Sequence, residues 1–175
     1  TPISSRRIYY FARTTFARGD VLRSAELFRL AADARPEDFQ SPALLRSSLS
    51  ALGREDDARD AARTAIRRAE HVLMLNPLDG RALSLGSGAL MDDGQTERAL
   101  EWGNRAVELY PDDASALINA ACVHARAGQN EEVRPLLAGQ DLIDDLLGGL
   151  ARERPPALGA VRLADRGVQE TQVIV

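Results

Sequence analysis

One cysteine and two histidines are the side chains of this sequence with most capacity for nucleophilic or metal chemistry. Cys122 and His124 stand two positions apart in a stretch with a helical pattern, so their side chains point to different sides and cannot act directly as a nucleophile and its base. His71 is far from both, and two separated histidines give no recognisable metal-ligand spacing. We therefore expect no catalytic residue, no metal site and no cofactor, and we place His124 between the helices of its unit and His71 on a partly exposed face.

Phosphate chemistry is not indicated by the pattern either. All 22 basic residues are arginines, and without lysine the chain can form no Schiff base and has no P-loop or kinase lysine. The stretch LGSGAL contains Gly86 and Gly88, but it lies inside a helical pattern and not at a strand-to-helix turn. Close packing of helices explains these glycines better than a phosphate site, and the sequence favours a non-catalytic protein.

The composition argues against nucleic acid and membrane as partners. A formal net charge of -4 gives no general attraction to nucleic acid or anionic lipid, and no stretch approaches the roughly 18 apolar residues of a membrane span. The single cysteine indicates a reducing compartment, so we expect a cytoplasmic location. The first residues, TPISSRR, lack an initiating methionine and a signal-like apolar run, which indicates a fragment or a processed chain.

Recurring glycines and prolines indicate the helices that would hold the residues of a functional site. Each of four glycines ends a helical pattern just before a polar helix start, and each of three prolines closes the helix that follows. The glycines are spaced by 34, 41 and 34 residues, and the prolines by 41 and 34. Such a recurrence is typical of stacked helix pairs, with glycine in the turn inside a pair and proline in the turn between pairs. The residues are Gly19, Gly53, Gly94, Gly128, Pro36, Pro77 and Pro111.

Small residues recur at fixed distances from these glycines and let neighbouring helices approach closely. Seven residues before the glycine stand Ala12, Ser87 and Ala121, with Arg46 as the exception. Close packing of small side chains explains how a chain with only 5% aromatic residues can form a core. Trp102, the single tryptophan, is expected to pack against the next unit, with a surface anchor for a partner as the less favoured alternative.

With this arrangement of glycines, prolines and small residues the chain resembles the tetratricopeptide repeat family. The segment 80–113, GRALSLGSGALMDDGQTERALEWGNRAVELYPDD, is the most similar unit, and the resemblance covers roughly residues 5–140. It implies an all-α, right-handed solenoid of about four helix-turn-helix repeats with a C-terminal capping segment. Two departures are Gly103, where the family prefers a bulky residue, and Pro135, early in the last helix.

A narrower similarity, from LNPLDG to GQNEE, links the chain to the repeat arrays of bacterial signalling and regulatory proteins. We expect one helical repeat domain over residues 1–150 and a C-terminal tail over 151–175. The stretch LIDDLLGGLARER, which runs across this boundary, is expected to form a capping helix over the last unit. The β-prone end of that tail, VQETQVIV, could occupy a groove or pack on an end surface, and the sequence leaves both open. The expected units are 5–38, 39–79, 80–113 and 114–150.

The second helix of the second unit, residues 54–76, is expected to be longer than its equivalents. The distance from glycine to proline is 24 residues there and 17 in the first and third units. Seven additional residues are about two turns and shift the helix phase by only about 20°, so the alanine stripe toward the core survives. Arg59, Arg63 and Arg67 line another face, with acidic residues one turn away. We favour a solvated, salt-bridged face over an arginine docking face.

In the family that the chain resembles, the first helices of successive units line a concave groove that holds an extended peptide. The corresponding stripe here carries four arginines against one aspartate, Asp92, so the groove is expected to be locally basic. Arginine offers paired donors that suit a carboxylate, and we therefore predict an acidic or C-terminal peptide as the ligand. The alternative, that these arginines are ordinary solvated side chains, has equal weight. The expected peptide-binding residues are Arg6, Tyr9, Arg13, Arg81, Ser84, Ser115, Asn119 and Arg126.

The sequence thus predicts a non-catalytic protein-protein interaction module that binds a protein or peptide partner. Its setting is expected to be a bacterial signalling or regulatory protein in the cytoplasm. A self-assembly module is the alternative, in which a homodimer or larger oligomer forms through the long helix or the C-terminal tail.

Overall fold

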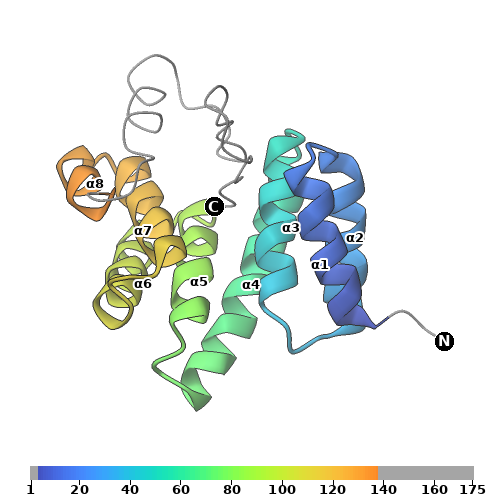
Figure 1. Cartoon of the computed structure of the whole chain (residues 1–175), viewed down its shortest axis with the longest axis horizontal. Coiled ribbons are helices and arrows are strands. Elements are labelled where there is room, and N and C mark those ends of the chain that lie inside the picture. The colour runs from blue at the N-terminus through green and yellow to red at the C-terminus, as the bar shows by residue number, and fades with distance from the viewer. Residues whose placement is uncertain (1–3, 138–175) are drawn as a thin grey trace.

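The computed structural model describes residues 4–137, and this part of the chain folds into eight α-helices that stack in sequence order (Figure 1). Each helix packs against the one before it, and α5 also contacts α3 and α7. The predicted all-α solenoid of helical repeats is confirmed over these residues, whereas the expected capping helix and tail lie outside them. No helix in the described part of the chain is long and apolar enough to span a lipid bilayer. The helices are α1 Ser5–Ala17, α2 Val21–Ala34, α3 Gln40–Ala51, α4 Glu55–Leu75, α5 Gly80–Asp92, α6 Thr96–Leu109, α7 Ala114–Arg126 and α8 Asn130–Leu137.

Glycine follows the first helix of each pair because the turn there needs a left-handed backbone. Gly19 and Gly94 have φ values of 81° and 80°, a conformation that costs residues with a Cβ free energy. The next N–H then bonds back into the helix, as Gln95 N does to Leu90 O at 2.9 Å. The direction of the chain is thereby reversed within two or three residues, and the second helix lies against the first.

An aspartate two residues after each proline starts the next helix pair. The Asp79 carboxylate accepts a hydrogen bond from Ala82 N at 2.8 Å, and that of Asp113 accepts one from Ala116 N at 2.9 Å. Each satisfies a backbone donor that the first turn of α5 or α7 would otherwise leave unpaired. Asp38 acts similarly before α3, and as a result a carboxylate marks the N-terminal end of every first helix after α1.

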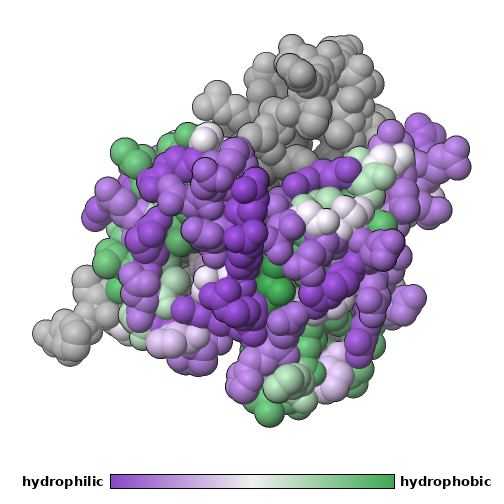
Figure 2. All heavy atoms as spheres, turned by 180° about the vertical axis from the view of Figure 1, so that it is seen from behind, coloured by the Kyte–Doolittle hydropathy of each residue, from purple (hydrophilic) through white to green (hydrophobic). Residues whose placement is uncertain are grey.

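Helix α4 is the long helix that the sequence predicts. It has 21 residues, against 14 in α2 and 14 in α6, which equals the seven-residue insertion. Its alanine stripe is buried along the helix, and Ala62 and Ala69 are completely covered. At its C-terminal end Met74 and Leu75 are 75% and 76% exposed. Figure 2 shows hydrophobic surface gathered at the lower edge of the molecule, where Figure 1 places this end of α4.

Two of the three arginines on the outer face of α4, Arg59 and Arg63, take part in ion pairs, and Arg67 bonds to Thr64. Arg59 lies 3.2 Å from Asp56 on the same helix, and Arg63 lies 2.7 Å from Asp93, which follows α5. Exposed pairs of this kind contribute about 0–1 kcal/mol each. The solvated, salt-bridged face that we favoured is therefore what the structure contains.

Trp102 fills the space that Gly86 leaves open between α6 and α5. A Cβ on Gly86 would lie 2.5 Å from Cζ3 of the Trp102 ring, so a larger residue there would displace the ring. The guanidinium carbon of Arg98 lies 5.6 Å from the ring centroid. The tryptophan therefore packs against the first helix of its own pair.

Arg68 connects α4 to the turn between the first two helix pairs. Its Nη1 lies within hydrogen-bond distance of the carbonyl oxygens of Ala32, Arg35 and Asp38, at 3.1, 3.2 and 2.9 Å. The last carbonyls of α2 have no partner inside that helix, and they carry the partial negative charge of its C-terminus. One cationic side chain thus satisfies the end of α2 and fixes the turn that leads to α3.

Replacing Arg68 with methionine keeps the apolar stem and removes the donors. We expect the free energy of unfolding to fall by about 2 kcal/mol, because hydrogen bonds from charged donors contribute about 1.5–3 kcal/mol. Urea unfolding followed by circular dichroism measures the change. Arg67→Met is the matched control, since Arg67 bonds to Thr64 on the exposed face, and its effect should stay within about 0.5 kcal/mol. Equal losses in the two variants would contradict the role given to Arg68.

Candidate functional site

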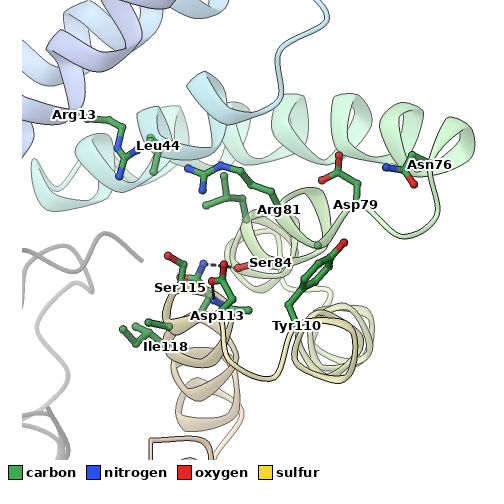
Figure 3. A pocket seen from close by; sticks show the side chains of 15 residues that line it. Arg13, Leu44, Asn76, Asp79, Arg81, Ser84, Tyr110, Asp113, Ser115 and Ile118 are labelled. Carbon is green, nitrogen blue, oxygen red and sulfur yellow. Dashed lines mark hydrogen bonds between the residues drawn. The ribbon is translucent and has the colours of Figure 1, made fainter. Parts of the chain in front are cut away.

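A cavity of about 570 Å³ opens on the side of the molecule that the odd-numbered helices form (Figure 3). Side chains of α1, α3, α5 and α7 line it, together with residues of the turns before α5 and α7. Five of the eight residues expected to bind a peptide lie in its wall, although they come from helices far apart in the sequence. These five are Arg13, Arg81, Ser84, Ser115 and Asn119.

Arg81 is held in the cavity by side chains of two other helices. Its Nε donates to Gln40 Oε1 of α3 at 2.7 Å, and its Nη2 donates to the Tyr9 hydroxyl of α1 at 3.3 Å. The Tyr9 hydroxyl donates to Gln40 Oε1 at 3.2 Å, which closes a triangle. The guanidinium is therefore oriented by neutral groups, and no carboxylate of residues 4–137 pairs with it.

Arg13 of α1 brings a second positive charge to the same cavity. Its guanidinium carbon lies 5.9 Å from the centroid of the Tyr9 ring, a geometry in which the face of the ring attracts a cation. Arg13 is half-buried, and it forms no ion pair within the described part of the chain. The buried Tyr9 thus contacts both arginines, one through its ring and the other through its hydroxyl.

Polar side chains also connect α5 and α7 in the wall of the cavity. Asn119 Nδ2 donates to Ser84 Oγ at 2.7 Å, and both residues are buried. Ser115 lies one turn before Asn119 on α7 and is exposed (Figure 3). The hydroxyl and amide groups here can both donate and accept hydrogen bonds, which is what the backbone of an extended chain requires.

Two carboxylates line the cavity as well, so the groove that we expected to be locally basic also carries negative charge. Asp79 and Asp113 are the residues that cap α5 and α7, each through its Oδ1. In Figure 3, Asp79 lies on the far side of Arg81 from Arg13. The site therefore presents both signs of charge. Sequence reasoning missed these two residues, although the recurrence of aspartate two positions after proline could have identified them.

Arg126 does not line this cavity, contrary to expectation. It pairs with Asp92, and Arg46 of α3 pairs with the other oxygen of the same carboxylate. Arg46 is 5% exposed and lies against Gly88, where a Cβ would be 2.4 Å from its Nη2. The arginine that breaks the small-residue pattern is thus accommodated by a glycine on the next first helix. The resulting cluster, Arg46–Asp92–Arg126, joins α3, α5 and α7.

The charge of Asp92 is maintained by its two arginines. Burial raises the pKa of Asp92, but Arg46 and Arg126 together lower it by more, so the net pKa lies below its ordinary value. A carboxyl group whose pKa falls on folding stabilises the fold above its unfolded pKa, and this contribution disappears as the pH drops through the folded value. Arg46 Nε has no hydrogen-bond partner in the described residues, so Asp92 is the counter-charge that this arginine depends on.

Arg6, another of the expected arginines, belongs to a separate cavity of about 170 Å³. This smaller cavity lies at the start of α1 and includes Tyr9, Tyr10, Arg35 and Asp38. Of the four expected groove arginines, only Arg13 and Arg81 therefore share the larger cavity.

Cys122 and His124, two of the three residues first considered for chemistry, are buried in helix contacts, whereas His71 on α4 is exposed. Burial raises the pKa of Cys122 to about 11, so its thiol stays protonated at neutral pH. His124 Nε2 lies 2.7 Å from Asn104 Oδ1 of α6, and its Nδ1 lies 2.8 Å from Gln129 Oε1. His124 thus joins α7 both to α6 of the preceding helix pair and, through Gln129, to the turn of its own pair. Within residues 4–137, no three potential metal ligands cluster.

Asp92→Asn should lower the free energy of unfolding by about 3 kcal/mol, because Arg46 would be buried without its counter-charge. As the pH falls below about 4, Asp92 of the wild type becomes protonated and its contribution to the free energy of unfolding is lost. The variant has no carboxyl group at this position, so its free energy of unfolding should fall less over the same pH range. Thermal unfolding over a pH series measures both effects. Asp56→Asn, at an exposed ion pair, is the control and should change neither. A variant with the pH profile of the wild type would refute this account of the cluster.

Comparisons with known proteins identify the fold. No protein-family model matches the chain, and no curated protein matches it. The TPR-like repeats of a kinesin light chain from Podosopora anserina superpose with a TM-score of 0.54 and 20% identity, over 87% of this chain and 79% of that one. MamA from Desulfovibrio magneticus RS-1 superposes with a TM-score of 0.49 and 22% identity, over 79% of this chain and 78% of that one. The first TPR of Spaghetti (RPAP3), solved with an HSP90 peptide, superposes with a TM-score of 0.48 and 18% identity, over 71% of this chain and 93% of that one.

The helix order, the glycine turns inside each pair and the superposition on the kinesin light chain repeats agree with one another. The chain therefore has a tetratricopeptide-like helical repeat fold.

Proposed function

We propose that the cavity between the odd-numbered helices binds an extended segment of a partner protein through carboxylates of that segment. The observation that carries this proposal is the pair Arg13 and Arg81, which face one cavity and have no carboxylate partner among residues 4–137. A guanidinium group in a concave surface attracts a carboxylate more strongly than one in open solvent, because less water screens the pair. A cavity of about 570 Å³ is of the size that holds a small ligand or a few residues of an extended chain.

Arg81 is oriented before any ligand arrives. Its bonds to Gln40 and Tyr9 use Nε and part of Nη2, so they favour one orientation of this exposed side chain and reduce the side-chain entropy that binding would cost. Its Nη1 is left to donate to a carboxylate oxygen. Ser115 and Asn119 stand on the facing helix, where they supply donors and acceptors for the peptide backbone.

Asp79 and Asp113 restrict which acidic segments can bind. A ligand carboxylate beside either residue would be repelled, whereas a backbone N–H or a basic side chain would be attracted. The favoured ligand therefore places its acidic residues toward Arg13 and Arg81 and neutral or basic residues toward the N-termini of α5 and α7. The pattern of charge along the segment, more than its net charge, decides the affinity.

We place this interaction module, with no catalytic role, in a cytoplasmic signalling or regulatory protein of a bacterium. The support for this setting is the sequence similarity that runs from LNPLDG to GQNEE. The absence of a catalytic role is supported by the protonated thiol of Cys122 and by the two hydrogen-bonded ring nitrogens of His124.

Self-assembly through the end of α4 is the second candidate function. Its support is the exposed apolar end that Met74, Leu75 and Leu78 form, since exposed apolar patches often mark interaction sites. Sedimentation over a concentration series tests it. A mass that grows with concentration and returns to the monomer value in Leu75→Asp would favour assembly, and a constant monomer mass would exclude it.

Charge reversal in Arg13→Glu or Arg81→Glu should weaken the binding of an acidic peptide at least tenfold, which is about 1.4 kcal/mol. The probe is a short fluorescent peptide that ends in glutamates and a free carboxylate, and its twin has glutamines and an amidated end. Fluorescence anisotropy at low and moderate salt measures the affinity, which should fall as salt screens the pairs. Arg29→Glu, on α2 and outside both cavities, is the control. The proposal would be contradicted if all three variants bound the acidic peptide with equal affinity, or if the wild type bound the acidic and the amidated glutamine peptides equally.

A further inference from the structure

The outer face of α1 exposes four positions that every later first helix buries. They lie twelve, nine, eight and five residues before the glycine of the turn, and in α1 they are Arg7, Tyr10, Phe11 and Thr14. The twelve equivalent residues in α3, α5 and α7 are all buried. They are Ser41, Leu44, Leu45 and Ser48 in α3, Ala82, Leu85, Gly86 and Ala89 in α5, and Ala116, Asn119, Ala120 and Val123 in α7.

The second helix of the preceding pair packs against these first helices. Ser48 Oγ of α3 hydrogen-bonds with Ser24 Oγ of α2 at 3.0 Å. Ala120 of α7 lies so close to α6 that a Cβ on Gly103 would be 3.6 Å from its Cα. Helix α5 packs on α4 in the same order. Among the described residues no helix lies against this face of α1, and its side chains are exposed although they have the register of a helix-packing face.

We propose that this face of α1 binds an amphipathic, acidic helix of a partner protein, which lies antiparallel to α1 in the place of a preceding second helix. Phe11 and Tyr10 supply the apolar contact, since they are 56% and 55% exposed. Phe11 is larger than its equivalents Gly86 and Ala120, so the docking helix needs a small residue opposite it, as Gly103 is opposite Ala120.

The charges around the face select an acidic helix. Helix α1 contains arginines and no aspartate or glutamate, and Arg18 follows its last turn. Arg7 and Arg18 form no ion pair within the part of the chain that the structure describes, and they lie eleven residues apart, about 16 Å along a helix. A helix of three to four turns with a glutamate or aspartate near each end would reach both arginines. None of the four positions lines the larger cavity and only Tyr10 lines the smaller one, so this proposal does not depend on peptide binding in the groove.

Two synthetic helical peptides test the proposal with the full chain. Both carry alanine and leucine on one face, and they differ in having either glutamates or lysines eleven residues apart. Fluorescence anisotropy is measured for the wild type, for Phe11→Glu, and for the control Leu30→Glu, whose leucine is 54% exposed on α2 outside the face. The acidic peptide should bind the wild type and the control equally. It should bind Phe11→Glu at least tenfold more weakly, and the lysine peptide should bind the wild type at least tenfold more weakly.

Several results would overturn the proposal. The proposal fails if the acidic peptide does not bind the wild type, or if the wild type binds the two peptides equally. It also fails if Phe11→Glu binds the acidic peptide with the affinity of the wild type. A mass that doubles with concentration and returns to the monomer in Phe11→Glu would identify a second copy as the occupant instead. A lower melting temperature of Phe11→Glu than of Leu30→Glu, without peptide, would show that the same chain already covers the face. Circular dichroism confirms that each variant is folded.

Discussion

Close approach of helices, made possible where a side chain is missing, is the constraint on which the rest of this structure depends. Gly86 and Gly88 stand two residues apart on α5 and therefore face different sides of the helix. One accommodates the ring of Trp102 from α6, and the other accommodates the guanidinium of Arg46 from α3. Two of the largest side chains in the chain are thereby buried against the same helix. Helix α5 can contact both neighbouring first helices because its own side chains are small.

Polar contacts then fix the first helices relative to one another. The triangle of Tyr9, Gln40 and Arg81 connects α1, α3 and α5, and the bond between Ser84 and Asn119 connects α5 and α7. The cluster of Arg46, Asp92 and Arg126 connects α3, α5 and α7 at another level. Hydrogen bonds weaken steeply when their geometry changes, so these contacts specify the spacing of the helices more narrowly than apolar packing does. The cavity inherits a defined shape from them.

The sequence predicts the helix pairs and the long α4 because glycine, proline and alanine recur at regular spacings in these segments. It also predicts that Arg13, Arg81, Ser84, Ser115 and Asn119 share one surface, because they follow the helical stripe of the first helices. It does not predict that Arg126 is neutralised, since Arg46 and Asp92 are 46 residues apart and no periodicity indicates their pairing. It also does not identify the cap residues Asp79 and Asp113 as residues of the site. Only the three-dimensional arrangement shows that helix starts also lie in the wall of the cavity.

The extra seven residues of α4 show how this architecture tolerates growth. A heptad restores the helix to nearly its original rotation, so α4 gains roughly 10 Å of reach while its alanines still face the core. Three or four added residues would also add length, but each would turn the stripe by tens of degrees toward solvent. A second heptad would double the residual rotation to about 40°. The length of one helix in such an array therefore changes in steps of seven residues. The distance that this helix extends beyond its neighbours can change in this way largely independently of the curvature of the stack.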